Sequence, residues 1–337
     1  MRRVAGDNAG FTLLEFTVAN AITMVVLAGT FQLLNMAFKV NSSIGEVMST
    51  QQNIRVAMNT IARDITMAGT GLPDGGIAIP NGAGAVALTR PGAGGTLPTG
   101  DNVIPILSPG NSVVTVAGTA TDVITVVSID QESPAWTVTA VDPAGTQVSF
   151  AQDIRAVGTW QMAADTTVLV FSSPNGACFG VVTSVSATAS QANFAAADVL
   201  NLNQPAAAAG NIKSLKNADG TYPPMSATRV NLITYYLNNS NPAHPRLMRA
   251  VNAQTPQVTV EDVDNLQFSY DLFDFDTNVS TSNQPSTTSP NQIRSVNIQL
   301  NGRSPAILSN TKDFYRFGLV SKVNIRNATF RNRYEGT

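Results

Sequence analysis

The chain has 337 residues, with 20 Lys+Arg against 22 Asp+Glu, so its formal net charge at pH 7 is −2. Charged residues make up 12% of it, about half of the roughly 25% found in average soluble domains, and this balance argues against a general nucleic-acid binder, which has a strong basic excess. Cys178 and His244 are the only cysteine and histidine, which excludes an intramolecular disulfide and a zinc cluster of Cys and His ligands.

The first part of the chain is the most distinctive. A short polar leader, residues 1–10, contains Arg2 and Arg3 and precedes an apolar run from Phe11 to Phe38 whose only charge is Glu15. As a helix this run would measure about 42 Å, and about 20 residues are enough to cross the core of a bilayer. The sequence therefore predicts a membrane-spanning helix.

Two ordinary interpretations of this run meet difficulties. A cleavable signal peptide could end at Ala19-Asn20-Ala21, but Glu15 interrupts its apolar region and the apolar pattern continues well past Ala21. An uncleaved anchor explains the length and leaves Glu15 unexplained, because a carboxylate near the bilayer centre costs roughly 2.5–3.5 kcal/mol on insertion scales. Such a residue is a functional candidate that needs a partner.

The junction itself supplies a third interpretation. Gly10-Phe11-Thr12-Leu13-Leu14-Glu15 resembles the class III signal of type IV pilins and type II secretion pseudopilins. In that family a prepilin peptidase cuts after the glycine and methylates the new N-terminus. The resemblance implies cleavage between Gly10 and Phe11, N-methylation of Phe11, and a role in filament assembly for Glu15. Its carboxylate would pair with the amine of Phe11, from its own or a neighbouring subunit, because charges buried in an apolar bundle are tolerable mainly as a pair.

The helical pattern continues beyond the apolar run. From Lys39 the sequence becomes amphipathic, and the spacing predicts a helix that ends at Ala68, just before Gly69. We expect its apolar face to pack on the protein's own sheet rather than on a partner helix. The residues of that face are Ile44, Val47, Met48, Gln51, Ile54, Met58, Ile61, Ile65 and Ala68.

The remainder of the chain is rich in short β patterns. Residues 73–100 are rich in Gly and Pro and predict an extended loop, residues 186–216 fit either loop or short helix, and Thr277–Asn291 predicts a mobile surface loop. The predicted strands are Asn102–Leu107, Ser112–Ala117, Asp122–Ile129, Trp136–Val141, Gln147–Phe150, Thr167–Phe171, Val181–Val185, Arg229–Leu237, Arg246–Val251, Gln257–Val260, Leu266–Phe275, Gln292–Leu300 and Leu319–Arg326.

Both ends of the chain carry a second resemblance. Gln52–Gly71 looks like the helix end of PilW-type minor pilins, and apolar patterns starting at Ile233, Arg246, Val260 and Ile293 follow in the order of that group, whereas residues 73–228 match no family pattern. The resemblance implies an α+β, type IV pilin-like fold, with a long N-terminal helix packed on a large antiparallel β-rich head. The expected parts are a leader (1–10), a transmembrane half (11–38) and an amphipathic half (39–70) of the helix, and the head (71–337), with 71–228 a candidate lineage-specific insertion.

The function implied by the resemblance is that of a minor pilin, a structural subunit of a type IV pilus and not an enzyme, without a cofactor. It would sit in the bacterial inner membrane as a single-pass protein with its head in the periplasm, then in the pilus at the cell surface. It would take part in starting assembly or in the tip complex. Its partners would be the prepilin peptidase, the major pilin and other minor pilins, the inner-membrane assembly platform and membrane lipid, with no nucleic acid.

Three alternatives stay open at this point. The chain could be a J-type minor pseudopilin of a type II secretion system, because such proteins share the same N-terminal cleavage signal and apolar helix. It could be a tip adhesin or a DNA-uptake binding module, or an anchored β domain that forms no filament.

Other residues offer little chemistry. His244 lies in a turn context, where an exposed histidine is expected rather than a catalytic base, and Cys178 is expected to be a buried small apolar residue. Asp274 and Asp276 are expected on one face of a strand, where they form a weak Ca²⁺ candidate without the EF-hand pattern. The remaining aromatic candidates are expected in the core; they are Trp136, Trp160, Tyr235 and Tyr236.

Overall fold

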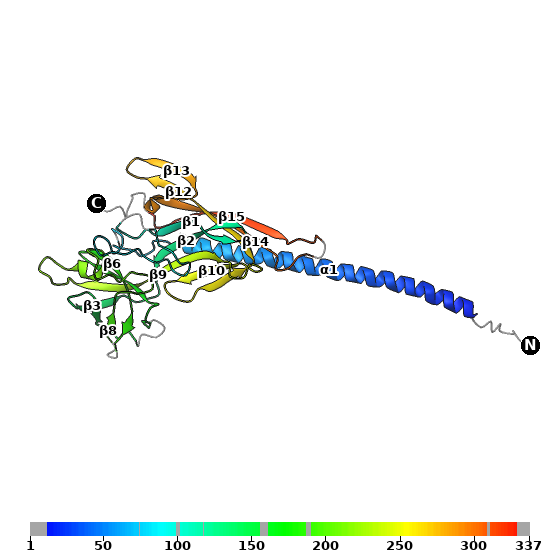
Figure 1. The fold of residues 1–337 in the computed structure, drawn as a ribbon, viewed down its shortest axis with the longest axis horizontal. Coiled ribbons are helices and arrows are strands. Elements are labelled where there is room, and N and C mark those ends of the chain that lie inside the picture. Colours follow the sequence, from blue (N-terminus) through cyan, green and yellow to red (C-terminus); the bar gives the residue numbers. More distant parts are fainter. Residues whose placement is uncertain are drawn as a thin grey trace, which may run out of the picture. The chain divides into compact units, whose positions relative to one another are not determined.

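The computed structural model describes residues 12–73, 75–98, 102–116, 118–155, 161–186, 190–308 and 311–328. It contains one long helix, α1 (Leu13–Thr66), short 3₁₀ turns η1 (Ile212–Leu215) and η2 (Pro290–Gln292), and a series of strands (Figure 1). The strands are β1 (Leu107–Val116), β2 (Thr119–Ile129), β3 (Trp136–Val141), β4 (Gln147–Phe150), β5 (Val168–Ser173), β6 (Gly176–Val181), β7 (Ser184–Val185), β8 (Gln191–Asn193), β9 (Met225–Asn238), β10 (Arg246–Val251), β11 (Gln257–Glu261), β12 (Val263–Asp274), β13 (Val279–Gln284), β14 (Ile293–Arg303) and β15 (Arg316–Asn324).

The helix ends close to the position that the sequence predicts. Regular α-helix stops at Thr66, and a turn carries the chain through Gly69, whose φ of 75° is a left-handed conformation that glycine adopts without strain. The Gly69 N–H then donates to the carbonyl of Val127 at 2.8 Å, which joins the end of the helix to β2. A side chain at Gly69 would also press on Ile106, because its Cβ would lie 3.0 Å from Ile106 Cγ2.

The chain divides into two packing units. One, the helical unit, consists of the described residues up to Thr50 together with Ser304–Tyr315. The other, the head, consists of Gln51–Arg303 and the described residues from Arg316 onward. Most of the β-structure belongs to the head.

The larger sheet of the head is organised around β9. This 14-residue strand pairs with β2 through Val230–Tyr235 and with β3 through Met225–Ala227. It also pairs with β5 through Ser226–Val230 and with β10 through Ile233–Asn238. All these pairings are antiparallel, and β1, β4, β6, β7, β8 and β11 extend the sheet outward from them. Strands from 71–228 thus share one sheet with strands from the later part of the chain.

The smaller sheet has four antiparallel strands in the order β13-β12-β14-β15. Its outer strand β13 corrects the prediction of a mobile loop over Thr277–Asn291, because Val279–Gln284 pairs with β12. The error has a physical cause: β13 is a polar edge strand whose first five residues are exposed, so it shows none of the apolar alternation by which strands are recognised.

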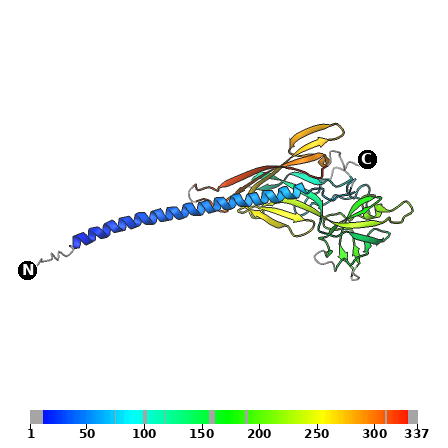
Figure 2. The ribbon, with the colours of Figure 1, turned by 180° about the vertical axis from the view of Figure 1, so that it is seen from behind.

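The main core of the head joins the end of the helix to both sheets. Ile54, Met58, Ile61 and Ile65 of α1 are buried in one cluster with apolar residues of β2, β9, β12 and β14. In two opposite views the cyan end of α1 runs along these strands (Figures 1 and 2). The predicted packing on the protein's own sheet is therefore confirmed for Ile54–Ala68. It is wrong for Ile44 and Met48, which are 52% and 65% exposed.

A second buried apolar cluster packs against the part of the larger sheet that contains β3–β6 and β8, and it includes side chains of η1. Trp136, Phe171 and Phe194 are its large side chains, and the rings of Phe171 and Phe194 meet edge to face with centroids 5.2 Å apart. Most of this cluster comes from residues 136–215, which show no family pattern in the sequence. Both of these large clusters therefore include residues of the larger sheet.

Candidate functional site

The start of α1 is held by a reciprocal cap between Thr12 and Glu15. Glu15 Oε2 accepts hydrogen bonds from the Thr12 N–H and from Thr12 Oγ1, each at 2.9 Å, and Thr12 Oγ1 accepts the Glu15 N–H at 3.3 Å. This is the capping box, in which Ser or Thr at the N-cap and Glu or Gln three residues later satisfy otherwise unpaired N–H groups. Glu15 therefore has a local structural role that its charge alone does not suggest.

The cap leaves part of the Glu15 carboxylate unused. Among the described residues no hydrogen bond reaches Oε1, and no described cation forms an ion pair with Glu15. Gly10 and Phe11, the predicted cleavage junction, lie outside the described residues. The structure thus places Glu15 at the first turn of the helix, with one carboxylate oxygen that accepts from no described residue.

The helix beyond this cap presents an apolar surface. Every residue from Thr12 to Ser42 is exposed in the chain by itself, including large apolar side chains such as Leu13, Phe16, Phe31 and Phe38. Within the described residues, α1 is the one helix that is long and apolar enough to cross a membrane. Side chains of this size exposed in water are costly, about 25 cal/mol for each Å² of apolar surface, so this segment requires lipid or protein around it.

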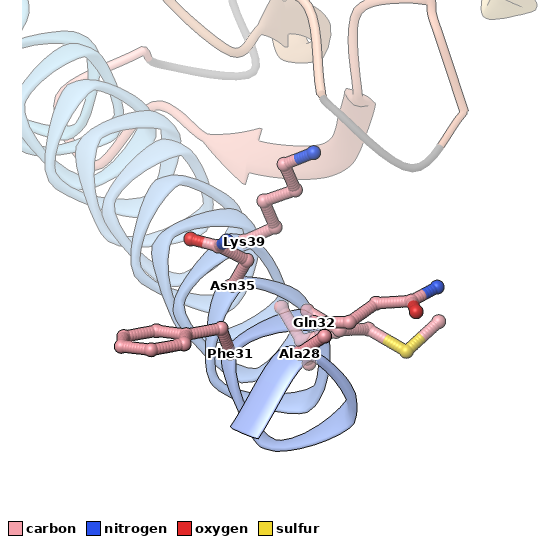
Figure 3. Close-up of a pocket in the computed structure, with 7 residues that line it drawn as sticks. Ala28, Phe31, Gln32, Asn35 and Lys39 are labelled. Carbon is pink, nitrogen blue, oxygen red and sulfur yellow. The ribbon is translucent and has the colours of Figure 1, made fainter. Parts of the chain in front are cut away.

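A few polar side chains interrupt that surface near the middle of the helix. Gln32, Asn35 and Lys39 follow one another at steps of three and four, so they lie on one side of α1 (Figure 3). The hollow that they line, with Ala28, Phe31, Met36 and Val40, is lined by α1 alone among the described residues. It is therefore open space beside a helix, and Lys39 marks the polar end of the apolar run.

The proposed carboxylate pair of the Ca²⁺ candidate does not form as predicted. Asp274 is the last residue of β12, whereas Asp276 lies in the turn that leads to β13, so the two do not share a strand face. Asp274 instead organises the turn: its carboxylate accepts the Asp276 N–H at 3.0 Å and the Thr277 hydroxyl at 2.7 Å. No group of three or more His, Cys, Asp or Glu side chains suited to a metal occurs among the described residues.

The single histidine and cysteine have structural surroundings. His244 lies in the turn before β10, as predicted, with Nδ1 2.7 Å from Asp262 Oδ1, a contact that the sequence did not suggest. Cys178 is fully buried on β6, also as predicted, and burial raises the pKa of its thiol. Trp136, Tyr235 and Tyr236 are buried as expected, and Trp160 lies outside the described residues.

A polar cluster that sequence reasoning missed connects the end of α1 to the sheet. Asp64 Oδ2 accepts hydrogen bonds from the Tyr235 hydroxyl at 2.6 Å and from Arg249 Nε at 2.9 Å. Burial and the neighbouring charge of Asp64 raise the pKa of the Tyr235 hydroxyl, which therefore stays protonated as a donor. The three residues come from α1, β9 and β10, and no local pattern in the sequence could have brought them together.

Comparison of the chain with protein-family models, curated proteins and solved structures finds no match. The N-terminal motif and the geometry of α1 are therefore the features of this chain that bear on its function.

Proposed function

We propose that the chain is a minor pilin: a structural subunit of a type IV pilus that is held in the inner membrane by the first half of α1 and then transferred into the filament. Three features that occur together at the start of the chain support this proposal. A Gly-Phe junction, a carboxylate five residues after the glycine, and the start of a helix able to span a membrane all fall within residues 10–15.

The physical logic follows from the two parts of α1. Residues that need lipid or protein around them occupy its first part, and Ile54–Ile65 fix its last part in the head. A subunit built in this way can leave the bilayer only if a bundle of similar helices replaces the lipid. Oε1 of Glu15, which accepts from no described residue, could then pair with an amine where water is excluded.

The strength of that pairing depends on its surroundings. At 4 Å two unit charges attract by about 1 kcal/mol in water and by about 4 kcal/mol at an effective dielectric constant near 20. An α-amine is largely protonated at neutral pH. In this proposal the Phe11 amine created by cleavage supplies the positive charge, so Glu15 contributes little to the isolated subunit and much to docking beside another.

The decisive experiment is mass spectrometry of the mature N-terminus in cells that make type IV pili. We expect a chain that begins at Phe11, is N-methylated, and lacks the ten leader residues. Replacement of Gly10 by a bulky residue should leave the full-length form in the membrane, and replacement of Ala9 by Ser serves as the control beside the junction. Normal processing of the Gly10 variant, or a mature chain that starts elsewhere, would refute the proposal.

Substitutions at Thr12 and Glu15 separate the cap from the charge. Glu15→Gln keeps a side chain that can complete a capping box and removes the charge, whereas Thr12→Val removes the capping hydroxyl and keeps the carboxylate. Glu15→Gln should therefore be processed normally and be depleted from sheared filaments as strongly as Glu15→Val, while Thr12→Val enters them. Recovery of Glu15→Gln in filaments at wild-type abundance would show that Glu15 acts only as a helix cap.

A further inference from the structure

Arg90 is a buried cation in the loop that precedes the larger sheet. Arg90 is 3% exposed. It belongs to a tight loop in which the backbone N–H of Arg90 donates to the carbonyl of Gly95 at 3.0 Å. Leu97 N–H donates to the carbonyl of Leu88 at 2.9 Å and closes the same loop. The loop therefore holds the Arg90 side chain against the head in one place.

Within the described part of the chain, the guanidinium is bound only by neutral oxygens. Nη1 donates to the Ser108 carbonyl at 3.1 Å and to Thr125 Oγ1 at 2.8 Å, and Nη2 donates to the Pro109 carbonyl at 2.9 Å. No ion pair to Arg90 is formed by any described residue. Asp122 is a buried carboxylate on β2, and it accepts the N–H groups of Ser112 and Phe268 instead.

This arrangement leaves one edge of the guanidinium unused. Three of its five N–H groups are engaged, and the other two, on Nε and Nη2, donate to no described residue. Two N–H groups in this fork match the two oxygens of a carboxylate. A buried cation without a counter-charge is costly, and burial lowers the pKa of Arg90 to about 10.

A pocket of about 420 Å³ is lined in part by Arg90. Gly110 forms part of its wall, and a Cβ at that position would lie 3.1 Å from Arg90 Nη2, so the glycine keeps the space beside the guanidinium open. The other polar side chains of the described lining are neutral: Thr96, Asn111, Ser286 and Thr287. They come from the Arg90 loop, from β1 and from the loop after β13.

We propose that this pocket binds a small carboxylate-bearing ligand of the size of a uronic acid, with the carboxylate on the free edge of Arg90 and the ligand hydroxyls on the neutral side chains of the rim. One buried cation surrounded by hydroxyl and amide groups fits a ligand with a single negative charge and several hydroxyls. The volume lies within the range of small-molecule sites. The described lining residues all belong to the head, and none belongs to the part of α1 on which the proposed function depends.

The test uses the full-length protein in detergent micelles, with sodium glucuronate as the probe and glucose as the neutral sugar of matched size. At constant ionic strength, glucuronate should raise the thermal unfolding midpoint in a saturable way and give a binding isotherm by calorimetry, whereas glucose should do neither. Acetate should bind more weakly than glucuronate, because it has no hydroxyls for the rim. Equal responses to glucuronate and glucose, no response to either, or tighter binding of inorganic phosphate would overturn the proposal.

Three variants locate the response. Arg90→Lys keeps the charge and removes the fork, and Gly110→Ala keeps the arginine and places a methyl group 3.1 Å from Nη2. Each should weaken glucuronate binding at least tenfold. Arg246→Lys, the same change at an arginine outside the pocket, should bind as the wild type does. If Arg90→Lys does not fold, the affinity of Gly110→Ala for glucuronate is the deciding measurement. An affinity equal to that of the wild type would contradict the proposed site.

Discussion

Asp271 ties together all four strands of the smaller sheet. From β12 its carboxylate accepts the N–H of Asn283 on β13 at 2.8 Å, the hydroxyl of Ser295 on β14 at 2.8 Å, and the ammonium of Lys322 on β15 at 2.6 Å. Burial raises the pKa of this carboxyl, but the bonds from Lys322, Asn283 and Ser295 outweigh burial and lower it to about 2. The ionised form is therefore the one that the folded sheet stabilises.

This pKa shift predicts a pH dependence. Because the folded-state pKa lies below the ordinary value near 4, the stabilisation is complete above that value and is lost as the pH falls toward 2. Asp271→Asn should lower the free energy of unfolding by about 1–2 kcal/mol at pH 7 and by much less at pH 2, where about half of the wild-type carboxyls are protonated. Thermal unfolding of both proteins from pH 7 down to pH 2 measures the difference.

The control for this comparison is Glu132→Gln, since Glu132 is exposed and its carboxylate forms no hydrogen bond or ion pair with a described residue. Its effect should be small at every pH. An Asp271→Asn deficit that is as large at pH 2 as at pH 7 would show that the asparagine disturbs packing and that charge plays no part.

At the scale of elements, α1 contains two isoleucines in contrasting surroundings. Ile61 is fully buried in the main core of the head, and Ile44 is 52% exposed in the helical unit. Truncation of Ile61 to alanine leaves a cavity and should cost about 2–5 kcal/mol, whereas Ile44→Ala should change the stability by no more than about 0.5 kcal/mol. Chemical denaturation of the detergent-solubilised protein, followed by near-UV circular dichroism, compares the two.

Both substitutions replace isoleucine by alanine in the same helix, so the change in helix propensity is the same in both. The difference between their effects on stability therefore reports burial alone. Equal losses would mean that the helix end does not depend on the core described for the head.

Local patterns predicted some elements to the residue and missed others for identifiable reasons. The bounds of β3, β4 and β10 agree with the predictions, because each is a short alternating run between turn residues. In contrast, Leu107–Val116 forms one strand where the sequence predicted two, since Pro109 and Gly110 look like a break and are accommodated by an irregularity in the pairing with β2.

The candidate sites divide in the same way. Glu15 is a candidate that the sequence alone supplies, because its motif is contiguous; its cap with Thr12 is a local contact, and its role in assembly stays a prediction. Arg90 gave no signal, because its significance comes from carbonyls of Ser108 and Pro109 and from a glycine that lies 20 residues further along the chain. Contacts between distant segments leave no periodic pattern in the sequence.

At the scale of the whole molecule, the fold of the described residues depends on no covalent cross-link. Cys178 is the only cysteine in the chain and is fully buried on β6. The thermal midpoint of the full-length protein should therefore be the same with and without reductant, and a thiol reagent should label Cys178 only after denaturant is added. A midpoint that falls with reductant would reveal a disulfide between two chains.

The position of β9 has a consequence for the order in which the chain is made. Its partner β2 ends at Ile129, and the first β9 residue that pairs with it, Val230, is synthesised about 100 residues later, which takes roughly 5–20 s at 5–20 residues per second. β3 and β5 are synthesised within that interval, and until β9 follows, β2, β3 and β5 lack the strand that joins them, so their unpaired edges are open to aggregation and proteolysis. Biogenesis of the head thus has a vulnerable period set by strand order, during which a chaperone that covers β edges would raise the yield without changing the stability of the finished protein.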